Sequence, residues 1–79
     1  MTYKEAKGLL WDACKADGWT MSSPTLKVPH ATSSTGVRLW FRPQAIWYGP
    51  AGTMHDALST WVDVRTPAGR ETLLRWGQK

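Results

Sequence analysis

The sequence has very little cysteine and no long apolar run. Its 79 residues include one cysteine, Cys14, so the chain cannot form an internal disulfide or a zinc site built on several thiolates. A lone cysteine is typical of a reducing compartment, and we expect a cytoplasmic location. No apolar run approaches the roughly 20 residues that cross a bilayer, and the beginning MTYKEAKGLL lacks the layout of a secretory signal. We therefore expect neither a membrane partner nor secretion.

Acidic residues are missing from the middle of the chain. Residues 19–50 carry Lys27, Arg38 and Arg42 but no aspartate or glutamate, whereas three acids balance the three lysines of residues 1–18. The formal net charge is +4 and the isoelectric point is about 9.7. This charge favours an anionic partner, and the middle third is where we expect a basic surface.

Large side chains compensate for the small size of the chain. A domain of this length gains only about 3–5 kcal/mol from one core without disulfides or metals, and each buried tryptophan removes roughly 150–250 Å² from water. Six tryptophans are present. We therefore expect residues 1–79 to form one small domain, with Cys14, Trp11, Trp19 and Trp76 in or beside its core.

Two helices are predicted, one near each end of the chain. Thr2 and Glu5 have the spacing of a capping box, apolar residues then recur at helical spacing, and Gly18 is a typical helix stop. This pattern predicts a helix over residues 3–17. Thr66 followed by Pro67 is a typical helix entry, which predicts a short C-terminal helix.

Extended structure is predicted between the helices. Residues 37–42 (VRLWFR) and 58–65 (LSTWVDVR) alternate in the way that half-buried strands do. Residues 44–48 can either extend the first of these strands past Pro43 or return beside it. TLKV, residues 25–28, has the alternation of an edge strand, and HATSSTG, residues 30–36, is typical of a loop. The order favours an α+β two-layer sandwich, α-β-β-β(-β)-α, with an antiparallel sheet and both helices on one face.

Alternation in these strands places basic and aromatic side chains on the sheet face that the helices leave open. A ring offers a stacking surface to a base, and guanidinium groups bind phosphates. The segment LKVPHATSSTG beside the strands can add a phosphate contact. The predicted nucleic-acid-binding residues are Lys27, His30, Arg38, Trp40, Arg42, Trp61 and Arg65. The alternative is structural: the same tryptophans can cover their neighbours, with arginines stacked on the rings.

No group of residues has the spacing of a catalytic or metal site. His55 and Asp56 are adjacent, and neighbours on one loop rarely reach the geometry of an acid–base pair. The two histidines and Cys14 lie too far apart in the sequence to form a zinc motif. We expect a protein that is not an enzyme and that needs neither metal nor cofactor.

Two short stretches resemble known families. Pro29 and His30 in VPHATS resemble the G-P-x-H loop of double-stranded RNA-binding domains, which implies contact with a minor groove; the lysine-rich start of that family's last helix is here TPAGRET, in which Arg70 is the basic residue. LLWDACKADGWTM, residues 9–21, resembles the beginning of small HicA-type messenger-RNA-cleaving toxins. Their glycine-serine-histidine signature is absent, and His30 is the residue that can stand in for its histidine.

Three functions therefore stand as hypotheses. The first is a small basic non-enzymatic module that contacts nucleic acid through the tryptophan–arginine face. The second is a protein-interaction module, an inhibitor or accessory factor of a phage or mobile element, that binds a protein or a second copy of itself through that face or through Trp47 and Tyr48. The third is a HicA-like ribonuclease that depends on His30 or His55.

Overall fold

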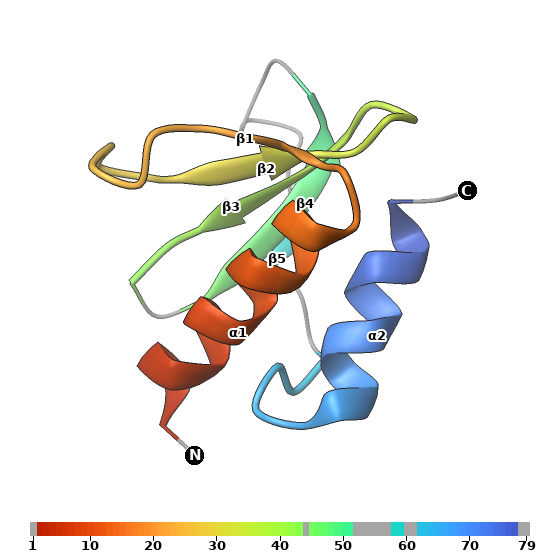
Figure 1. The fold of residues 1–79 in the computed structure, drawn as a ribbon. Helices are drawn as coiled ribbons and strands as arrows, with labels where there is room; N and C mark the ends of the chain where they lie inside the picture. Colours follow the sequence, from red (N-terminus) through yellow and green to blue (C-terminus); the bar gives the residue numbers. More distant parts are fainter. Residues whose placement is uncertain (1, 44, 52–57, 60–61, 78–79) are drawn as a thin grey trace.

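Two helices lie on one face of an antiparallel sheet in the computed structural model (Figure 1). The structure describes residues 2–43, 45–51, 58–59 and 62–77. In chain order the elements are α1 (Tyr3–Ala16), β1 (Thr20–Met21), β2 (His30–Thr32), β3 (Val37–Phe41), β4 (Ile46–Pro50), β5 (Leu58–Ser59) and α2 (Pro67–Trp76). The predicted α+β sandwich with both helices on one sheet face is confirmed.

Local capping groups explain where both helices begin. The Thr2 hydroxyl accepts a hydrogen bond from the Glu5 backbone N–H at 3.2 Å, and the Glu5 carboxylate accepts one from the Thr2 backbone N–H at 3.3 Å. At α2 the Thr66 hydroxyl accepts the Gly69 N–H at 3.1 Å, with Pro67 in the first turn. α1 ends before Gly18, whose φ of +86° is a conformation that glycine adopts without strain.

Each strand pairs with its neighbour in the sequence, in the order β1-β2-β3-β4-β5. The sequence left open the direction of residues 44–48. The described residues 45–48 return beside β3, and Arg42 donates its N–H to the Ala45 carbonyl at 3.0 Å. In this register Trp40 lies opposite Trp47 on β4 and opposite His30 on β2.

Two strand predictions are wrong. TLKV lies in turns, and the first three residues of the predicted loop HATSSTG form β2, which pairs with β3. The Ser22 hydroxyl accepts the His30 N–H at 2.9 Å, and backbone pairing with β3 begins at Pro29, whose carbonyl accepts the Phe41 N–H at 2.8 Å. In the described part of residues 58–65 only Leu58–Ser59 is a strand, because Asp63 accepts hydrogen bonds that form a turn leading to Thr66.

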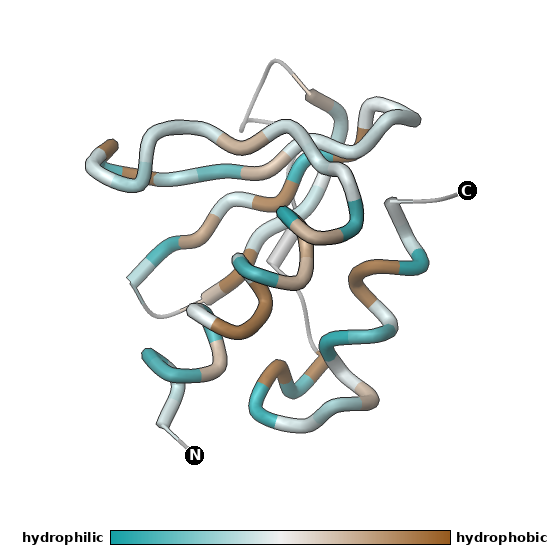
Figure 2. Tube along the Cα trace, viewed as in Figure 1, coloured by the Kyte–Doolittle hydropathy of each residue, from teal (hydrophilic) through white to brown (hydrophobic). Residues whose placement is uncertain are grey.

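The core lies between the helices and the sheet. Its largest fully buried side chains are Leu10, Leu39, Ile46, Leu73 and Cys14. Trp19 is 6% exposed, and Trp11 and Trp76 pack against the same cluster, as predicted. In Figure 2 hydrophobic segments of α2 lie on the side that is turned toward α1. Neither helix of the described chain is long and apolar enough to cross a membrane.

Candidate nucleic-acid interface

The sheet face turned away from the helices carries Arg38, Trp40, Arg42 and Trp47; we call it the open face. Leu39 and Phe41 belong to the core on the helix side. Since side chains alternate along an extended chain, Arg38, Trp40 and Arg42 lie on the opposite side. Trp47 is directly opposite Trp40 on β4 and therefore shares that side. Neither described helix covers this face (Figure 1).

Both arginines of the open face lie over tryptophan rings. The guanidinium carbon of Arg42 is 4.6 Å from the centroid of the Trp47 ring, and that of Arg38 is 6.0 Å from the Trp40 ring. Arg38 also donates from Nε to the Thr32 hydroxyl at 2.8 Å. Cation–π contact and one hydrogen bond restrict the guanidinium groups and leave their terminal nitrogens able to donate to a ligand.

Within the described residues neither Arg38 nor Arg42 forms an ion pair with a carboxylate. The ion pair found among these residues joins Arg65 to Asp63. Strands β1 to β4 and the turns between them come from residues 20–50, which contain no acid. The charge of the open face is therefore not neutralised by these strands.

Trp40 is not the uncovered stacking surface that strand alternation predicts. Trp40 is only 5% exposed. Its neighbours in the register are His30 and Trp47, and the Arg38 guanidinium lies over its ring. Trp47 is only partly buried and, with Arg42, Pro43 and Ala45, borders a cavity of about 380 Å³. The more accessible tryptophan of the open face is therefore Trp47 and not Trp40. The predicted nucleic-acid site did not include Trp47, because the sequence did not show which way residues 44–48 run.

The other predicted site residues are spread more widely. His30 is partly buried on β2 opposite Trp40, and Lys27 is exposed in the segment before β2. Arg65 is not on a strand: it lies in the turn before α2, 3.1 Å from Asp63. The hydrogen bonds from Arg65, first from its side chain and then from its backbone, lower the pKa of the Asp63 carboxyl. Trp61 lies outside the described residues, as do His55 and Asp56.

The described residues contain no candidate metal centre of three or more histidine, cysteine or acidic side chains. Cys14 is fully buried in the core, and burial, followed by the nearby charge of Asp17, raises the pKa of its thiol to about 12. A neutral, buried thiol is a poor nucleophile.

Comparison of the chain with protein-family models, with curated proteins and with solved structures finds no match in any of the three.

Proposed function

We propose that this protein is a small, basic, non-enzymatic module that binds nucleic acid through the open face. The observation that carries the proposal is that Arg38 and Arg42 lie on the same side of the sheet, each over a tryptophan ring and neither paired with a described carboxylate. Guanidinium groups of this kind bind phosphates through charge and paired hydrogen bonds.

A single-stranded nucleic acid suits this surface better than a double-stranded one. The partly exposed Trp47 ring can stack on one base, and stacking of this kind does not depend on base identity. Lys27, exposed before β2, adds a further positive charge for the backbone. The face is short, so we expect it to contact only a few nucleotides.

The test measures the affinity for labelled single-stranded DNA and RNA oligonucleotides by fluorescence anisotropy. We expect the double variant Arg38→Ala/Arg42→Ala to bind at least about tenfold more weakly, since each charge-assisted contact contributes on the order of 1 kcal/mol or more. Arg75→Ala is the matched control, because Arg75 is exposed on α2 and the change removes one charge from the helix side. Equal effects of Arg75→Ala and of each single open-face change would contradict the proposal.

A protein partner is the second candidate, because an arginine stacked on a partly exposed tryptophan is also typical of interface hot spots. Its signature is a defined complex or homodimer that Trp47→Ala disrupts while the protein binds no oligonucleotide. Cleavage of the RNA in the same titrations, abolished by His30→Ala, would instead favour the ribonuclease.

A further inference from the structure

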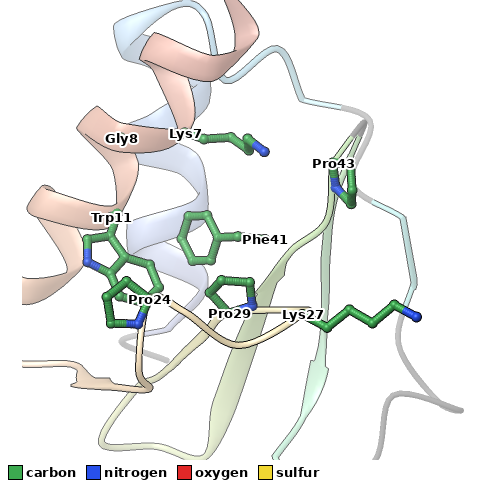
Figure 3. Close-up of a pocket in the computed structure, with 8 residues that line it drawn as sticks. All are labelled: Lys7, Gly8, Trp11, Pro24, Lys27, Pro29, Phe41 and Pro43. Carbon is green, nitrogen blue, oxygen red and sulfur yellow. The ribbon is translucent and has the colours of Figure 1, made fainter.

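A second cavity, of about 360 Å³, lies at one end of the sheet (Figure 3). It is formed by α1, by the segment between β1 and β2, and by the chain at the end of β3. Its apolar lining consists of Trp11, Pro24, Pro29, Phe41 and Pro43. This volume is in the range of small-molecule sites, which are concave and mostly apolar with a few polar groups.

The apolar lining is built from rings that change little on binding. Trp11 and Phe41 are packed edge to face, with ring centroids 5.2 Å apart. The other three apolar lining residues are prolines, whose side chains lose almost no conformational entropy when a ligand contacts them. Contact with these rings therefore costs little side-chain conformational entropy, which lowers the cost of binding.

Two ammonium groups supply the charge of this cavity. Lys7 extends from α1 above Phe41 toward Pro43, and Lys27 extends outward beyond Pro29 (Figure 3). The Lys7 ammonium donates to the Arg42 carbonyl at 3.4 Å and lies 5.4 Å from the Tyr3 ring, and none of the described lining residues is acidic. The cavity is largely open to solvent, with an apolar floor and a positive border that no carboxylate among the described lining residues neutralises.

Gly8 borders this cavity from α1. It lies within α1 and lines the cavity, although glycine in a helix interior costs about 1 kcal/mol relative to alanine. A Cβ at this position would meet nothing within 4 Å, so packing inside the protein does not require glycine here. The absence of a side chain leaves this border of the cavity open.

We propose that this cavity binds a small amphipathic anion, a flat apolar ring that carries one carboxylate. The ring would lie against Trp11 and Phe41, and the carboxylate would be held by Lys7, with Lys27 adding to the local positive charge. Apart from these ammonium groups, the hydrogen-bonding group found among the described lining side chains is the indole N–H of Trp11, which points away from Phe41 (Figure 3). A ligand with a polar edge, such as a nucleobase, therefore fits less well. The proposal does not depend on nucleic-acid binding at the open face.

The test uses isothermal titration calorimetry with 2-naphthoate and its neutral counterpart 2-naphthamide. We expect saturable binding of the carboxylate and affinity for the amide that is lower by about tenfold, because the amide cannot pair with the ammonium groups. Lys7→Met should reduce this difference to about threefold or less. Absence of naphthoate binding at millimolar concentration, or equal affinity for the two compounds, would overturn the proposal.

Gly8→Leu locates the site without removing a core residue. The added side chain grows into the cavity from a helix position that tolerates it, so we expect a stable protein whose naphthoate affinity falls by at least about tenfold. Ala16→Leu is the matched control, since it adds leucine at an exposed position of the same helix that does not line the cavity. Unchanged naphthoate binding in Gly8→Leu would place the ligand elsewhere, and adenosine monophosphate binding more tightly than naphthoate at this cavity would contradict the ligand class.

Discussion

Trp40 and Trp47 lie on the same sheet face but have different surroundings. Alternation along residues 37–42 correctly predicts that the Trp40 side chain points away from the helices. It cannot predict that the residue is only 5% exposed, because burial depends on residues outside the strand, such as its β2 and β4 neighbours, whose register the alternation does not give. Each residue's direction is local information, whereas its accessibility depends on the whole sheet.

Replacing each of these tryptophans by alanine should therefore have a different main effect. Trp40→Ala removes a buried ring and should lower the free energy of unfolding by about 3–5 kcal/mol, which is enough to unfold much of so small a domain. Trp47→Ala should cost less stability and should instead weaken oligonucleotide binding by about 1–3 kcal/mol. Urea denaturation and anisotropy titration of both variants test this difference. A folded Trp40→Ala protein with the binding defect, beside a fully active Trp47→Ala protein, would reverse the assignment.

The buried thiol of Cys14 should make stability decrease at alkaline pH. The unfolded chain ionises this thiol near its ordinary pKa of 9.0, whereas burial raises the pKa to about 12 in the folded protein. Between these values the unfolded state has released the proton and the folded state still holds it, so stability that is complete below pH 9 is lost as the pH rises. The contribution is about 1.4 kcal/mol at pH 10.

Urea denaturation near neutral pH and at pH about 10 measures this loss in the free energy of unfolding. The same measurements on Cys14→Ala serve as the control. The variant should lose about 1.4 kcal/mol less than the natural sequence over the same interval, because its other titrating groups are unchanged. An identical pH dependence of the two proteins would mean that the thiol ionises equally in both states.

The sequence predicts best those helices and strands whose ends are marked by residues close together in the chain. The capping box at Thr2, the stop at Gly18 and the Thr66-Pro67 entry each depend on residues within one turn. The first helix is found within a residue of its predicted ends, and the second begins at the predicted entry. β1 and β2 have two and three residues, too few for alternation to be visible. Their positions depend on pairing with β3, so the sequence placed a strand at TLKV where the chain makes turns.

Two glycines in helices should respond oppositely to alanine. Gly8→Ala should stabilise the protein by up to about 1 kcal/mol, because the position is exposed and an added Cβ meets nothing within 4 Å. Gly69→Ala should destabilise it by about 1–3 kcal/mol, because a Cβ there would collide with the Asp63 carbonyl in the turn before α2. Urea denaturation of both variants checks the signs, and destabilisation by Gly8→Ala would show that this position has a packing role after all.

At the scale of the whole molecule, the two candidate sites are built differently: the open face comes from the neighbouring strands β3 and β4, whereas the cavity combines residues from distant segments. The cavity joins Lys7 of α1, Lys27 of the segment before β2 and Pro43 after β3. No spacing pattern connects these residues, which is why the sequence does not reveal the cavity. The basic surface, in contrast to the cavity, is visible in the sequence, because residues 19–50 contain no acid. The sheet places Arg38 and Arg42 of this segment on one face.

This charge arrangement predicts how salt should act on nucleic-acid binding. Lys27, Arg38 and Arg42 are the basic residues of residues 19–50, and neutralising three phosphates of a single strand corresponds to a slope of about −2 in a plot of log affinity against log salt concentration. Arg38→Ala/Arg42→Ala should reduce the slope to about −0.7, because one phosphate contact remains. Arg75→Ala should leave it unchanged although it removes a charge from the same small protein. Anisotropy titrations over a range of salt concentrations measure these slopes. If Arg75→Ala instead reduced the slope as much as a single open-face change, binding would follow from net charge alone and the arrangement on the sheet would not matter.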